Sequence, residues 1–95
     1  MKIFQMSKFK SFVKKLPVQF QQIVLDAVEN ISADPEAGEL KIGDLQDFRV
    51  YKLKINRQLT LIAYKIQNDS VILYLAGSHQ NFYKNLKKYL KEIGE

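Results

Sequence analysis

Apolar side chains recur at a helical period through the first third of the chain. After Ser7, which we expect to cap a short helix, they fall three and four residues apart until Pro17, whose ring ends that helix. A longer helix follows and stops at Asp34-Pro35. Its apolar face comprises Phe20, Ile23, Val24, Ala27, Val28 and Ile31. Two amphipathic helices joined by a very short turn form a helical hairpin whose apolar faces require a cover.

The apolar period changes to two beyond Asp47, which is typical of β-strands. Asn, Asp and Arg residues separate the apolar runs, and Asn and Asp favour tight turns between antiparallel strands. Three strands are predicted in this way, at Phe48–Ile55, Leu59–Ile66 and Val71–Ala76. A weaker alternation predicts a short strand in the segment 2–7. The acidic segment 36–47 is predicted to be a loop.

A basic helix is predicted at the end of the chain, after the last apolar strand. Ser78 is its expected N-cap, because a serine hydroxyl accepts a hydrogen bond from an unpaired N–H of the first helical turn. The only histidine, His79, then lies near the positive end of the helix dipole, with Tyr83 four residues later on the same face. The residues alone leave open whether His79 is functional or a hydrogen-bonded structural group.

Together these elements predict one α+β domain that spans residues 1–95. We expect the N-terminal helical hairpin to pack on an antiparallel sheet of three or four strands, with the basic helix at the C-terminal end. We expect no internal repeat and no linker.

The composition excludes several classes of protein. There is no cysteine, so the chain has neither disulfides nor thiolate metal ligands, and a single histidine argues against a zinc centre. We therefore expect no metal and no cofactor. No apolar run approaches the roughly 18 residues of a membrane span, and the start has no signal-peptide pattern. We expect a cytoplasmic protein that has no membrane partner.

The net charge of +5 is unevenly distributed along the chain. The segment 34–47 holds five acidic residues and one lysine, whereas the segment 48–95 holds nine basic residues and three acidic ones. A basic half of a domain favours a polyanionic partner, because Lys and Arg side chains on phosphates release counterions. A charged surface that merely keeps the protein soluble is the alternative.

Two lysines of the strand Phe48–Ile55 are candidates for chemistry. Lys52 and Lys54 share one face of the strand and stand about 7 Å apart. Each disfavours the charge of the other, so one of them is a candidate general base, while a charged lysine stabilises a phosphate. The alternative is protection of an edge strand against aggregation. Arg57, in the following turn, either contacts a phosphate or faces water.

Four motifs follow one another in a characteristic order: Asp44-Leu45, Phe48–Ile55, Leu61–Tyr64 and Leu75–Tyr83. In these motifs, and in its length and order of elements, the chain resembles the RelE/ParE superfamily of bacterial type II toxins. The resemblance covers essentially the whole chain and implies the fold derived above, with a twisted sheet. Members of the superfamily are neutralised by a cognate antitoxin. The RelE-, YafQ- and HigB-like members cut mRNA in the ribosomal A site, and the ParE-like members poison DNA gyrase.

The resemblance implies catalytic roles for four residues. Lys52 and Lys54 match the RelE strand whose two lysines serve catalysis, and His79 matches the histidine that follows Gly-Ser in YafQ-like proteins. Tyr83 lies where those proteins place an aromatic side chain near the reacting nucleotide. Because these four residues occur together, the mRNA-cleaving branch is favoured.

The same comparison shows two departures from the RelE pattern. Leu61 stands where RelE has an arginine, and RelE has another arginine at the junction where this chain has its histidine. The resemblance therefore leaves the stabilisation of the phosphate to Lys54, Arg57 or Arg49.

The implied reaction is metal-independent, ribosome-dependent cleavage of mRNA, which inhibits translation. A base removes the proton of an RNA 2′-hydroxyl, the oxygen attacks the adjacent phosphate, and an acid protonates the leaving 5′-oxygen. Lys52 or Lys54 is the expected base and charge stabiliser, and His79 the expected acid or base. Tyr83 is expected to stack on the substrate or to hydrogen-bond it. The alternative is a gyrase inhibitor without catalytic activity, in which these residues are structural.

The resemblance also implies partners. An acidic antitoxin that folds on binding is expected to cover basic surface, and contacts with operator DNA are expected only through the antitoxin. The basic helix is expected to contact ribosomal RNA phosphates, unless its charges form a solvated face. Its candidate residues are Lys84, Lys87, Lys88 and Lys91.

Overall fold

A computed structural model describes all residues of the chain, from Met1 to Glu95. Its helices and strands follow the order expected from the sequence, with two short 3₁₀ turns, η1 and η2, inside the acidic segment. The elements are β1 (Lys2–Gln5), α1 (Ser7–Lys15), α2 (Val18–Ala33), η1 (Pro35–Ala37), β2 (Glu39–Leu40), η2 (Gly43–Leu45), β3 (Phe48–Ile55), β4 (Gln58–Gln67), β5 (Ser70–Ser78) and α3 (Phe82–Glu92). No helix is both long enough and apolar enough to cross a membrane.

The five strands form one mixed sheet in the order β1-β5-β4-β3-β2. The three long strands make the predicted antiparallel meander, because each tight turn joins neighbours in the sequence. The prediction of three or four antiparallel strands was wrong at both edges. The strand β1 pairs in parallel with β5, although most of the chain lies between them in the sequence. No turn motif marks such a pairing. The strand β2 is a two-residue addition beside β3, too short to produce a period.

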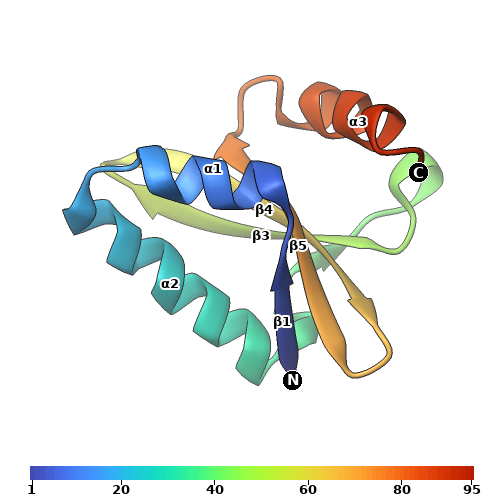
Figure 1. The fold of residues 1–95 in the computed structure, drawn as a ribbon, viewed down its shortest axis with the longest axis horizontal. Helices are drawn as coiled ribbons and strands as arrows, with labels where there is room; N and C mark the ends of the chain where they lie inside the picture. The colour runs from blue at the N-terminus through green and yellow to red at the C-terminus, as the bar shows by residue number, and fades with distance from the viewer.

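The helices cover the two faces of the sheet, as Figure 1 shows. The hairpin α1–α2 packs on one face, where Phe9, Val24 and Ile31 meet Ile62 and Leu73. The helix α3 packs on the other face through a second set of buried residues. These are Phe82, Leu86 and Leu90 against Phe48, Val50 and Leu61. The predicted α+β arrangement is therefore confirmed, and each of the three long strands contributes residues to both cores.

Neither expected serine cap is present. Ser7 is itself the first residue of α1, and Met6 occupies the cap position without a side-chain hydrogen bond. Ser78 is the last residue of β5, because it still pairs with Thr60 across the sheet. The helix α3 begins four residues later, at Phe82, after Asn81 in the left-handed conformation at φ 61°. An asparagine adopts this conformation more readily than most residues, so the turn before α3 depends on Asn81.

A buried tyrosine anchors the segment between α2 and β2. The Tyr64 hydroxyl donates to the Pro35 carbonyl at 2.6 Å and accepts from the Gly38 N–H at 2.8 Å. A Cβ atom on Gly38 would lie 2.6 Å from that hydroxyl, so only glycine fits beside the ring. Arg49 donates to the carbonyls of Gly38 and Glu36 at 2.8 and 3.1 Å. These bonds determine where β2 begins.

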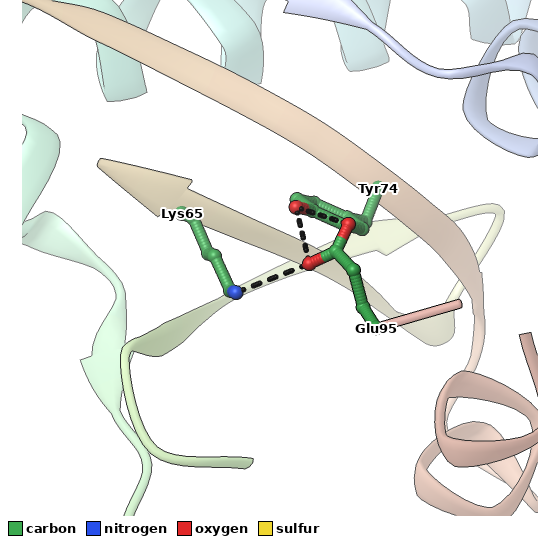
Figure 2. Close-up of polar contacts among 3 residues, drawn as sticks. All are labelled: Lys65, Tyr74 and Glu95. Atoms are coloured by element: carbon green, nitrogen blue, oxygen red, sulfur yellow. Dashed lines mark hydrogen bonds and ion pairs between the residues drawn. The ribbon is translucent and has the colours of Figure 1, made fainter. Parts of the chain in front are cut away.

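The last residue of the chain is tied back to the sheet, as Figure 2 shows. The Tyr74 hydroxyl lies 2.9 Å from both carboxylate oxygens of Glu95, and Lys65 Nζ lies 3.3 Å from one of them. Burial, followed by the nearby carboxylate, raises the pKa of the Tyr74 phenol. The ring packs edge-on against Phe48, with ring centroids 4.8 Å apart. The end of α3 is therefore held over the sheet by a phenol that stays neutral.

Candidate functional site

The two candidate lysines of β3 project from the face that α3 covers. Alternate side chains of a strand point to the same face, so Lys52 and Lys54 share a face with Phe48 and Val50. Phe48 and Val50 lie in the core beneath α3. Both lysines are exposed. The short strand β2 pairs only with Arg49 and Val50, so the part of β3 that carries the lysines is a free edge of the sheet. The predicted shared face is confirmed.

The strand register brings His79 next to this edge. Lys54 lies opposite Leu59 in the antiparallel ladder, and the backbone N–H of His79 donates to the carbonyl of Leu59 at 3.2 Å. His79 and Lys54 therefore flank Leu59 on its two sides. Two strand spacings put their backbones about 10 Å apart. The side chain of Leu59, on the same face, lies between them.

The tight turn between β3 and β4 adds an arginine. Asn56 and Arg57 both have positive φ, 50° and 68°, as a two-residue hairpin turn requires. Arg57, Lys54 and His79 line one open hollow of about 480 Å³. The other residues that line it are Gln58, Leu59, Ser78 and Gln80. The lining has one lysine, one arginine and no carboxylate, so the hollow favours an anion.

Lys52 lies beside this hollow without lining it. It pairs with Leu61, which in turn pairs with Gly77, so Lys52 occupies the row of the sheet next to Lys54. On its other side lies Glu39 of β2, which pairs with Val50. The hydrogen bond from Lys41 holds the pKa of the Glu39 carboxyl below its usual range, and the charges of Lys41 and then Lys52 lower it further.

Tyr83 belongs to a second group of side chains on the same face. Its ring packs edge-on against Phe82, with centroids 5.6 Å apart, and Lys41 Nζ lies 5.0 Å from the centroid of the Tyr83 ring. Lys41 is also hydrogen-bonded and ion-paired with Glu39. Tyr83 does not line the hollow at His79. The sequence analysis missed Lys41 and Glu39, although Lys41 is the single lysine of an acidic segment.

The remaining candidates lie apart from the hollow. Arg49 is on the opposite face, where the carbonyls of Glu36 and Gly38 occupy its guanidinium. The four lysines of α3 lie together along the solvent side of the helix, and Lys87 pairs with Asp44 at 3.4 Å. No group of three or more histidine and carboxylate side chains is placed to hold a metal ion.

Comparisons with known proteins agree with the resemblance found in the sequence. Residues 3–87 match a family model described as the ParE-like toxin of type II bacterial toxin–antitoxin systems. No curated protein matches. Among solved structures, Escherichia coli toxin RelE in its free, double-mutant form has a TM-score of 0.71 at 11% identity, with 96% of this chain and 94% of that chain covered.

Two further structures have the same fold. RelE in the intact Escherichia coli RelBE toxin–antitoxin complex has a TM-score of 0.63 at 14% identity, over 80% of this chain and 93% of that one. A conserved hypothetical protein from Helicobacter pylori has a TM-score of 0.53 at 21% identity, over 84% of this chain and 96% of that one. At these identities the structures establish a shared fold.

Proposed function

The chain belongs to the ParE-like toxins of type II bacterial toxin–antitoxin systems, and on that premise we propose that it is a ribosome-dependent endonuclease that cuts mRNA and inhibits translation. The observation that carries the proposal is the hollow lined by Lys54, Arg57 and His79. An RNA phosphate fits a site with cations on one side and a proton-transfer group on the other. A protein that acts only by docking needs no such arrangement.

The proposed reaction uses side chains of the hollow and Lys52, which lies beside it. Arg57 and Lys54 bind the scissile phosphate and stabilise the negative charge that develops on it. The 2′-oxygen attacks phosphorus, and the bond to the 5′-oxygen breaks, which leaves a 2′,3′-cyclic phosphate and a 5′-hydroxyl. One of His79 and Lys52 takes the proton of the 2′-hydroxyl, and the other gives a proton to the leaving 5′-oxygen. Lys52, in the adjacent row of the sheet, is the second candidate for the base.

An open and shallow site explains why the proposed enzyme depends on the ribosome. His79, Lys54 and Arg57 are all exposed, so the protein itself holds little of the substrate. In-line attack requires the 2′-oxygen, phosphorus and 5′-oxygen to be aligned, and orientation of this kind is worth several kcal/mol, up to about 7–11. The ribosome supplies that alignment in the proposal, and the α3 lysines contact ribosomal RNA.

An antitoxin is the second proposed partner. RelE, whose fold this chain shares, has been solved as a complex with its antitoxin. We expect an acidic antitoxin that orders on binding and covers the basic surface of this protein, and we expect operator DNA to be bound through the antitoxin.

The proposal is tested by adding the purified protein to a cell-free translation reaction and mapping the 3′ ends of the mRNA. We expect new ends with cyclic phosphates, and only while ribosomes translate. Lys54→Ala should slow the cleavage at least tenfold. Lys10→Met, on the exposed side of α1, should cleave at the wild-type rate and serves as the control. Intact mRNA would contradict the proposal.

The alternative function is inhibition of DNA gyrase without chemistry. The family model, which is described as ParE-like, is the observation that favours it. A supercoiling assay decides between the two functions. If the protein stops supercoiling by gyrase and leaves mRNA intact, the alternative holds. His79→Ala and Lys54→Ala should then have no effect beyond any loss of stability.

A further inference from the structure

Three side chains form a compact unit on the same face of the sheet as the hollow: Glu39, Lys41 and Tyr83. Lys41 is the first residue after β2. Its backbone N–H donates to the carbonyl of Phe48 at 2.9 Å, which fixes the position of Lys41 beside β3. Its ammonium group lies over the Tyr83 ring, 5.0 Å from the centroid, and pairs with Glu39. The lysine is thus held by its backbone, by an aromatic ring and by a carboxylate.

The two side chains of this ion pair differ in how far they are exposed to solvent. The Lys41 side chain is 22% exposed and the Glu39 side chain 60% exposed. Loss of Glu39 would therefore leave the ammonium in place over the Tyr83 ring. Hydrogen bonds with Glu39 and then Tyr83 raise the pKa of Lys41, so its charge persists at any neutral pH. An exposed carboxylate on a fixed cation occupies the position that an external anion would take.

The unit lies on the same face of the sheet as the catalytic candidates. Glu39 pairs with Val50 and Lys52 lies two residues further along β3, so Lys41, Lys52 and Lys54 follow one another across this face. Neighbouring phosphates of a single strand are about 6–7 Å apart, close to the spacing of alternate residues on a strand. Lys41 lies beside Phe48, six residues along β3 from Lys54, so a strand of RNA that runs from the hollow past Lys52 would reach Lys41 about two or three phosphates away.

We propose that Lys41 binds a second RNA phosphate, two or three positions along the strand from the cleaved one, and that Glu39 is a built-in competitor which this phosphate displaces. A base of the same RNA strand stacks on the Tyr83 ring. The inference rests on the proposed function, because it names a substrate contact of the same site. Glu39 disfavours anions that offer only one phosphate. Such an anion has to break the ion pair between Glu39 and Lys41, and it makes no second contact at Lys54 and Arg57 that would offset this loss.

The test measures binding of a short single-stranded RNA whose riboses are 2′-O-methylated, so that it binds without being cut. Fluorescence anisotropy gives the Kd at several salt concentrations. Lys41→Met should weaken binding about tenfold and reduce the slope of log K against log salt by about 0.7, the value for one phosphate contact on a single strand. Lys41→Arg should retain both the affinity and the slope.

Glu39→Gln should tighten binding several-fold, because no ion pair then has to be broken. Glu36→Gln is the matched control, since it removes the same charge from an exposed side chain of the same segment. The decisive comparison is the double variant. The gain from Glu39→Gln should vanish in the Lys41→Met background, because the two residues act through one contact.

Additive effects of Glu39→Gln and Lys41→Met, or wild-type binding by Lys41→Met, would overturn the inference. The proposed function would survive either result if His79→Ala still abolished cleavage of mRNA. A wild-type protein that does not bind this RNA would overturn the inference, and it would overturn the proposed function as well if it also left translated mRNA intact.

Discussion

At the scale of single residues, two buried tyrosines hold distant segments of the chain together, which their places in the sequence do not suggest. Tyr64 and Tyr74 read as ordinary strand residues, yet one anchors the segment before β2 and the other holds Glu95. In the sequence, Gly38 is one glycine of a loop. In the structure, the Tyr64 ring lies so close to it that no side chain fits at this position. These partners are 21 to 29 residues apart in the chain, so no local pattern connects them.

Replacement of Gly38 should destabilise the protein. Gly38→Ala places a Cβ 2.6 Å from the hydroxyl and 2.8 Å from Cε1 of the fully buried Tyr64 ring, so the ring or the loop must shift. We expect a loss of about 1–3 kcal/mol in the free energy of unfolding, measured in urea. Gly77→Ala is the control, because its Cβ meets only Phe82 at 3.8 Å and should cost less than about 1 kcal/mol. Equal losses in the two variants would contradict this account of Gly38.

The same two tyrosines predict how stability depends on pH. The pKa of Tyr64 and that of Tyr74 are raised in the folded protein, mainly by burial. The unfolded chain therefore loses these protons first as the pH rises. The stabilisation of the folded state that comes from these two raised pKa values is complete below pH 10, the ordinary pKa of tyrosine. It is lost progressively as the pH rises above that value. The free energy of unfolding in urea should fall as the pH rises above about 10, and Tyr74→Phe should make that fall shallower. An unchanged slope in Tyr74→Phe would contradict the assignment.

At the scale of elements, the sequence predicted those parts of the fold that local patterns encode. The period of α2, the three long strands and their turns all lie where expected. The parallel pairing of β1 with β5 could not be predicted, because it joins segments about 68 residues apart without a turn motif. The expected cap at Ser78 was wrong because the pairing of β5 with β4 continues beyond the apolar run, and periodicity does not show where pairing ends.

That same continuation of β5 determines the candidate site. The sequence placed His79 on the first turn of a helix with Tyr83 on its face, whereas the structure places His79 at the end of a strand beside Lys54. The residue types were identified from the sequence and their grouping was not. Lys41 was overlooked because the segment that holds it was interpreted only through its net negative charge.

The helix α3 provides a prediction at this scale. Its lysines form one exposed face, and Lys84 and Lys91 have no ion-pair partner. The double variant Lys84→Gln, Lys91→Gln should bind purified ribosomes more weakly, with a dependence of log K on log salt that is shallower by about 1 to 2. Thermal unfolding should be nearly unchanged, because surface substitutions of this kind usually cost less than about 0.5 kcal/mol. An unchanged salt dependence would assign these lysines to solubility alone.

At the scale of the whole molecule, charge and topology divide the domain into two sides. The hairpin α1–α2 covers one face of the sheet and α3 covers the other (Figure 1). The side chains of Lys41, Lys52 and Lys54 lie on the α3 face, and His79 lies beside its edge. The acidic segment ends at the border of this group, where Glu39 meets Lys41 and Asp44 meets Lys87. The proposal therefore places all contacts with RNA on one side of the protein, which an acidic antitoxin would have to cover or distort.

The most direct test of the proposed reaction is the single-turnover rate of mRNA cleavage on programmed ribosomes with His79→Ala. Loss of a proton-transfer group lowers the rate by about 10²- to 10⁴-fold, and we expect a loss within this range with little change in ribosome binding. Circular dichroism should show that the variant folds, since His79 is exposed and only its backbone is hydrogen-bonded. Cleavage by His79→Ala at the wild-type rate would contradict the assignment of chemistry to this hollow.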